Sequence, residues 1–113
     1  MPASNPTTDS SAGRPGGMLD LASNRPIATV VYRSRAQVGG RVRTVRVRPW
    51  GEVATLEAVI ADETGAVTVA FLGRRSIAGL VPGGWLTVEG MVGARNEKLV
   101  VLNPAYDLRP LDG

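Results

Sequence analysis

Arginine is the residue type in this sequence that is best suited to bind a ligand. Of the 113 residues, 12 are Arg and 1 is Lys, and seven of the arginines fall between Arg25 and Arg48, a stretch without Asp or Glu. A guanidinium group can donate two parallel hydrogen bonds to a phosphate. The cluster therefore favours partners that carry phosphate, although a high ratio of Arg to Lys can equally reflect the base composition of a genome.

The candidate ligand contacts lie in two polar segments. Arg46 and Arg48 alternate with Val45 and Val47, which gives the predicted strand one cationic and one aliphatic face. A second polar segment, residues 93–98, reads as a hairpin loop. The full set of candidate nucleic-acid-binding residues is Arg41, Arg43, Arg46, Arg48, Trp50, Arg95, Asn96 and Lys98. The alternative is that the arginines are ordinary solvated strand residues and that Asn96 serves the turn.

Trp50 is the most specific single candidate, because it stands in a Pro-Trp-Gly sequence that predicts a loop. An indole exposed in such a loop can stack on a nucleic-acid base, an interaction worth about 1 to 3 kcal/mol. The alternative is that Trp50 folds back as a lid over one end of a small core.

The residue types that are missing exclude most enzyme classes. The sequence has no Cys and no His, and so lacks thiolate nucleophiles, the usual metal ligands and the commonest general base. Asp62 and Glu63 are adjacent acids, but they occupy a predicted hairpin turn, where Asp has a structural role. We therefore expect a protein that is not an enzyme and has no cofactor. Without an export signal or an apolar run of about 18 residues, we expect a cytoplasmic location and no membrane contact.

The elements that must hold these residues are short strands separated by Gly, Pro and Asp turns. The β-prone stretch from Ile27 leads into a long first strand with a bulge near Arg43, where the apolar phase changes. We expect that strand to end at the Pro49 loop. In chain order, the elements expected after it are strands at Ala54–Ala61 and Ala66–Leu72, a short helix at Arg74–Leu80, and strands at Trp85–Val92 and Leu99–Leu102.

This order predicts an all-β domain, a five-stranded Greek-key oligonucleotide/oligosaccharide-binding (OB) barrel with one short helix between strands three and four. A small SH3-like barrel is the alternative fold, but it has no helix at that place. The expected domain covers residues 25–109. Residues 1–24 are rich in Ser, Pro and Gly and predict a disordered tail, and residues 110–113 a second short tail.

Residues 40–108 resemble the OB domains of the anticodon-binding type, and among these the wedge domain of the RecG branch-migration helicase. The resemblance rests on a Gly-Arg-Val start and on the segments ADETGAVTVAFLG, LVPGGWLTVEGMV and LVVLNPAYDL. The chain is also similar to small stand-alone OB proteins of actinobacteria. The resemblance implies binding of DNA or RNA, with DNA favoured, a role in DNA recombination or repair, and no catalytic residue.

The outward positions expected on strands two and three argue for a different partner. They include Val59, Ala70 and Leu72, which would form an apolar surface, and Glu57, which would repel phosphate. No aromatic residue is among them, whereas OB domains that bind single strands stack bases on aromatic side chains there. The alternative function is therefore a protein-interaction adaptor or a homodimer that uses this apolar face.

Overall fold

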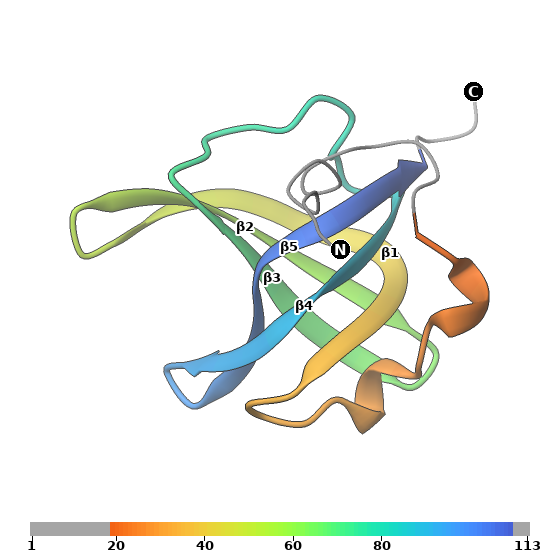
Figure 1. Cartoon of the computed structure of the whole chain (residues 1–113). Helices are drawn as coiled ribbons and strands as arrows, with labels where there is room; N and C mark the ends of the chain where they lie inside the picture. The colour runs from red at the N-terminus through yellow and green to blue at the C-terminus, as the bar shows by residue number, and fades with distance from the viewer. Residues whose placement is uncertain (1–18, 110–113) are drawn as a thin grey trace, which may run out of the picture.

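In the computed structural model, which describes residues 19–109, one β-sheet of five strands forms the body of the protein (Figure 1). The strands are β1 (Arg35–Trp50), β2 (Val53–Asp62), β3 (Gly65–Leu72), β4 (Trp85–Arg95) and β5 (Lys98–Arg109). Two single-turn 3-10 helices, η2 (Leu21–Ser23) and η3 (Ile27–Thr29), precede them. The nearly all-β, five-stranded architecture predicted from the sequence is confirmed.

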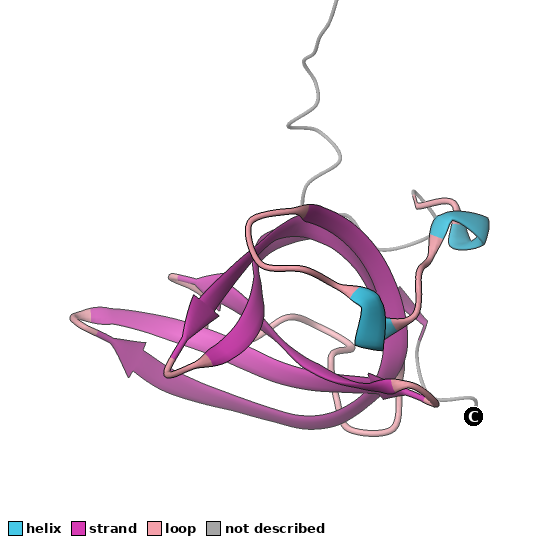
Figure 2. Cartoon of the chain, turned by 90° about the horizontal axis from the view of Figure 1, so that it is seen from below, coloured by secondary structure: helices cyan, strands magenta, loops and turns pink. Residues whose placement is uncertain are grey.

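The sheet closes on itself in a ring with the strand order β1-β2-β3-β5-β4, after which β4 pairs with β1 (Figure 2). All neighbours are antiparallel except β3 and β5, which are parallel over Thr68–Ala70. A ring leaves few unpaired backbone groups, which protects a small sheet from pairing with other chains.

Strand β1 closes the ring because it pairs with two neighbours along its length. Its first half, Arg35–Arg41, pairs with β4, and its second half, Arg41–Trp50, pairs with β2. At the crossover Gly40 lies so close to β2 that a Cβ atom there would be 2.7 Å from the carbonyl oxygen of Ala61. The predicted bulge is present, as a register shift between Val42 and Thr44.

The core is aliphatic and fills the inside of the ring. Alternate residues of each strand point inward, and the largest fully buried side chains include Leu56, Ile60 and Leu86. Phe71 and Tyr106 meet edge to face, with their ring centroids 5.6 Å apart.

The predicted helix at Arg74–Leu80 is wrong: residues 73–84 between β3 and β4 contain only turns and bends. Ile77 and Leu80, whose three-residue spacing was the basis of the predicted helix, are both buried. Only one turn joins them, with Leu80 N–H donating to the Ile77 carbonyl. Gly73, Gly79 and Gly83 have positive φ angles, which an α-helix cannot accommodate. The apolar spacing therefore reflects two side chains that plug the ring end, and not a helix.

The stretch before β1 also differs from the expectation. Residues 27–29 form η3 instead of extended strand, and a turn around Arg33, whose φ angle is 70°, separates it from β1. The η3 segment is held on the β2–β3 turn, where Asp62 Oδ2 accepts from Ile27 N–H and Thr64 Oγ1 accepts from Ala28 N–H, each at 3.0 Å.

The expected tails lie partly outside the described residues. Residues 1–18 and 110–113 are not among the described residues. Residues 20–24 of the expected N-terminal tail are described, and they contact β1: Gln37 Nε2 donates to the Asp20 carbonyl and to Asn24 Oδ1. Within residues 19–109, no helix has the length and the apolar character needed to cross a membrane.

The close approach at the crossover makes Gly40→Ala destabilising. The added methyl would overlap backbone atoms of Ala61, which cannot rotate away, and we expect a loss of about 1 to 3 kcal/mol in the free energy of unfolding, measured by urea denaturation. Gly65→Ala is the control, because its Cβ would meet nothing closer than 3.8 Å. Equal stabilities of the two variants would contradict the role of Gly40.

Asp62 makes the stability depend on pH. Burial alone would raise its pKa, but hydrogen bonds from Thr64, Ile27 and Gly65 outweigh burial and lower the pKa below the ordinary value. A carboxylate with a lowered pKa stabilises the fold fully above the unfolded pKa, about 3.9, and this contribution disappears as the pH falls through the folded pKa.

We therefore expect Asp62→Asn to lower the free energy of unfolding by about 1 kcal/mol at pH 7, the net value of a hydrogen bond, and by progressively less below about pH 4. Urea denaturation from pH 7 to pH 2 measures this difference, with Glu63→Gln as the control. A destabilisation that does not change with pH would refute the assignment.

Candidate nucleic-acid interface

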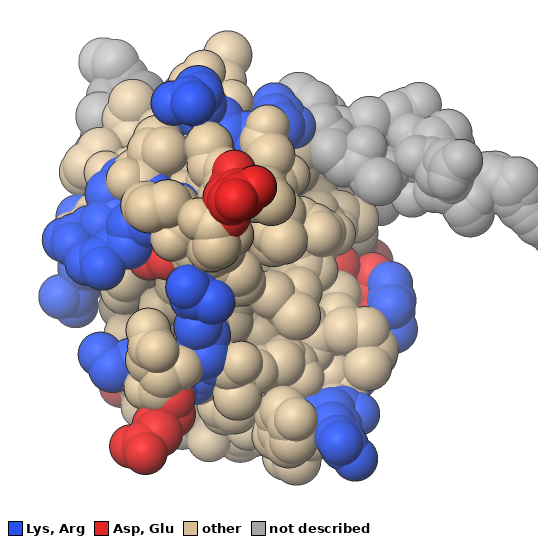
Figure 3. Space-filling model, turned by 90° about the vertical axis from the view of Figure 1, so that its left-hand side faces the viewer, with Lys and Arg blue, Asp and Glu red and all other residues tan. Residues whose placement is uncertain are grey.

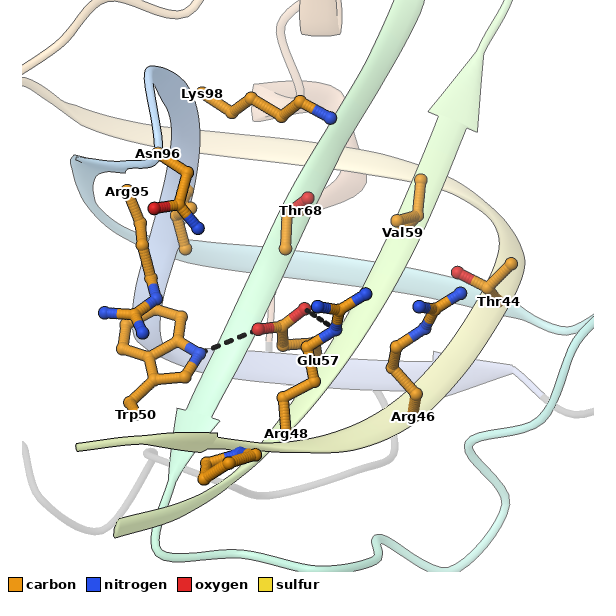
Figure 4. Close-up of a pocket in the computed structure, with 12 residues that line it drawn as sticks. Thr44, Arg46, Arg48, Trp50, Glu57, Val59, Thr68, Arg95, Asn96 and Lys98 are labelled. Carbon is orange, nitrogen blue, oxygen red and sulfur yellow. Dashed lines mark hydrogen bonds and ion pairs between the residues drawn. The ribbon is translucent and has the colours of Figure 1, made fainter. Parts of the chain in front are cut away.

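The fold brings most of the candidate residues into one groove on the outside of the ring (Figure 4). The groove has a volume of about 510 Å³ and lies across β2 and β3, between the β1–β2 hairpin and the β4–β5 hairpin. Its lining includes Arg46, Arg48, Trp50, Arg95, Asn96 and Lys98 from the predicted set. The other lining residues are Thr44, Pro49, Glu57, Val59, Thr68 and Val100.

Two predicted residues lie outside the groove. Arg41 donates from Nη1 to the Gly83 carbonyl at 2.8 Å, and its Cζ atom lies 5.8 Å from the centroid of the Trp85 ring. Arg43 is exposed at the bulge, where an extra residue interrupts the register between β1 and β2. The bulge thus separates these two arginines from the cationic row that follows.

The β1–β2 register sets the cationic row. Beyond the bulge, Thr44, Arg46 and Arg48 face outward, opposite Val59, Glu57 and Thr55 respectively. This part of β1 pairs only with β2, so Pro49, which has no N–H to donate, is tolerated on the free edge. The alternation of Arg with Val predicted this face correctly.

Trp50 is placed differently from both expectations. It is the last residue of β1, and the turn consists of Gly51 and Glu52, so the indole belongs to a strand and not to a loop. Its side chain is half-buried on the outer face of the sheet and is not part of the hydrophobic core. The indole is therefore neither a free loop side chain nor a lid over the core.

Glu57, on β2, holds two side chains of β1 in place, a role that the sequence did not reveal. Its Oε2 atom accepts a hydrogen bond from Trp50 Nε1 at 2.7 Å, and its Oε1 atom lies 3.6 Å from Arg48 Nε (Figure 4). The Glu57 side chain is only 18% exposed. The carboxylate that was expected to repel phosphate thus orients the indole and one arginine.

Arg95 covers the indole from the opposite hairpin. Its Cζ atom lies 4.3 Å from the Trp50 ring centroid, well within the range of a cation–π interaction. This contact joins the β1–β2 hairpin to the β4–β5 hairpin across the mouth of the groove. Any ligand base that stacks on this face of Trp50 must first displace the guanidinium group.

The β4–β5 turn places Arg95 and Lys98 opposite one another. Its two central residues, Asn96 and Glu97, have φ angles of 52° and 67°, as a two-residue type I′ hairpin turn requires. Asn tolerates this conformation, so the turn role considered for Asn96 is confirmed, and Asn96 also lines the groove.

The charge of the groove is positive. Arg46, Arg48, Arg95 and Lys98 line it together with a single acid, Glu57. Figure 3, which faces the side toward which both hairpins project, shows Lys and Arg side chains in several groups with fewer acidic side chains between them. The groove thus offers more donors to an anion than its own acid can satisfy. In the part of the chain that the structure describes, no cluster of three or more acidic residues could hold a metal ion.

The apolar face proposed for a protein partner is not continuous. Ala70 is fully buried, because its neighbours in register on the same face, Glu57 and Leu102, carry longer side chains. Leu72 is 38% exposed and Val59 is half-buried within the groove. Thr55 and Ala61, which alternate along β2 with Glu57 and Val59, are buried as well.

The turn predicts a stabilising substitution. Glu97 adopts a left-handed backbone conformation that favours Gly, and Asn-Gly is the preferred type I′ pair, so Glu97→Gly should raise the free energy of unfolding by about 0.5 to 1 kcal/mol. Thermal or urea unfolding measures the change. Asn96→Gly is the control and should have a smaller effect; a loss of stability in Glu97→Gly would contradict the turn type.

Comparison with known proteins identifies no family for this chain. No protein-family model matches the sequence, and no curated protein matches it. The similarity to the wedge domain of RecG has no support from these comparisons.

Proposed function

We propose that this protein binds nucleic acid through the groove, gripping the sugar-phosphate backbone with little sequence preference and without catalysis. The observation that carries the proposal is the lining: Arg46, Arg95 and Lys98 line the groove together with Trp50, while the one acid of the lining, Glu57, is already engaged by Trp50 and Arg48. Phosphate contacts position a nucleic acid without reading its sequence.

The position of the groove on the ring supports an OB fold. OB barrels bind oligonucleotides on strands two and three, between the loops that join strands one and two and strands four and five. The groove lies in the corresponding place, and the strand order β1-β2-β3-β5-β4 agrees with a Greek-key barrel of this kind. The resemblance noted in the sequence would place the protein in DNA recombination or repair, and it favours DNA over RNA.

The affinity should fall steeply with salt. Three or four neutralised phosphates release counterions, which for a single strand predicts a loss of about 20- to 50-fold in affinity between about 50 and 200 mM salt. Fluorescence anisotropy with labelled single-stranded, duplex and forked DNA measures this loss and ranks the substrates. No binding to any of them at 50 mM salt would overturn the proposal.

Matched variants assign the binding to the groove. Arg46→Gln and Lys98→Gln should each weaken binding and flatten the salt dependence, whereas Arg75→Gln, an exposed arginine outside the groove, should change neither. Trp50→Ala should cost about 1 to 3 kcal/mol of binding free energy if a base stacks on the indole, and Trp50→Phe should retain most of it. Circular dichroism checks that each variant is folded.

A further inference from the structure

A second depression continues the groove beyond Lys98. It has a volume of about 450 Å³, and it shares Val59, Thr68 and Lys98 with the groove. Ala66, on its floor, lies two residues from Thr68 along β3, which is about 7 Å in a strand. The groove and the depression therefore form one cleft with a cationic half and a second half of different character.

The second half of the cleft is aliphatic. Its remaining lining residues are Ile27, Ala28, Val30, Gly65, Ala66, Val67 and Leu99, and none of these is aromatic or charged. Lys98 at the shared rim is the only cation. The chemistry fits a ligand group that is small and apolar and that is attached directly to an anion.

The depression is built in advance and does not depend on a ligand to form. The η3 segment makes one wall, fixed by the bonds from Ile27 N–H to Asp62 and from Ala28 N–H to Thr64. Leu99, half-buried against the core, belongs to the opposite wall on β5. Two fixed walls admit a single unpaired base, whereas a paired base would bring its partner strand with it.

We propose that the depression holds an unpaired thymine whose phosphate contacts Lys98, an inference that rests on the proposed function. Among nucleic-acid bases thymine alone carries a methyl group, and aliphatic side chains recognise it by apolar contact. The methyl would lie against Val30 and Ala66, while the neighbouring nucleotide reaches the Trp50 end of the cleft. Uracil in RNA lacks this methyl group, so the site favours single-stranded DNA.

The test compares two ligands that differ only in the methyl group. Fluorescein-labelled hexamers of deoxythymidine and of deoxyuridine are titrated at 50 mM salt, and we expect the thymidine hexamer to bind about fourfold more tightly, the effect of burying one methyl. Val30→Thr keeps the shape of the wall but replaces a methyl with a hydroxyl, and it should abolish this preference. Val53→Thr, at an exposed valine outside both cavities, should leave it intact.

The outcomes separate this inference from the proposed function. Equal, salt-sensitive affinities for the two hexamers would overturn the thymine site and leave the proposed function standing. No binding of either hexamer would also overturn the thymine site, and the titrations with duplex and forked DNA would then decide the proposed function. Amide chemical shifts locate the ligand: the thymidine hexamer should perturb Val30, Ala66 and Leu99. If an alternating Asp-Leu decapeptide perturbs these amides and the hexamer does not, the depression serves a protein partner and the proposal is wrong.

Discussion

The close contact between Gly40 and the backbone of Ala61 lets β1 pair with two neighbouring strands, β4 and β2. The arrangement of the other elements depends on this contact. Because Gly40 has no side chain, β1 can bend there and pair with β4 through its first half and with β2 through its second. A side chain at this position would press on the backbone of Ala61 and strain the pairing of the two strands. Ring closure in turn leaves few exposed edges and encloses an aliphatic core that a flat sheet of this length could not bury.

The same closure positions the candidate site. Because β5 pairs with β3 on one side and with β4 on the other, the β4–β5 hairpin is carried round to the outer face of β2 and β3. There it meets the end of β1, and Arg95 comes to lie over Trp50 although the two residues are 45 positions apart in the sequence. The groove is therefore a product of topology: neither hairpin contains a binding site by itself.

The sequence predicted what depends on local pattern and missed what depends on contacts between distant segments. The alternation around Val45 and the phase change near Arg43 correctly located the cationic face and the bulge. Ile77 and Leu80 were correctly expected to be apolar contacts, but positive-φ glycines on both sides of them prevent the expected helix. The pairing of Glu57 with Trp50 could not be foreseen, because it depends on how strongly the hairpin twists and not on spacing along either strand.

Glu57 shows how an acid can stabilise a groove that we propose to bind anions. Without it, Arg46, Arg48, Arg95 and Lys98 would line the groove with no acid among them, and their mutual repulsion would push the long side chains outward into solvent. A carboxylate held by Trp50 and Arg48 offsets that repulsion and fixes the indole at the edge of the groove. Because four cations line the groove with this single acid, the charge of the groove stays positive. The groove thus combines an excess of positive charge with side chains that are already in position before a ligand arrives.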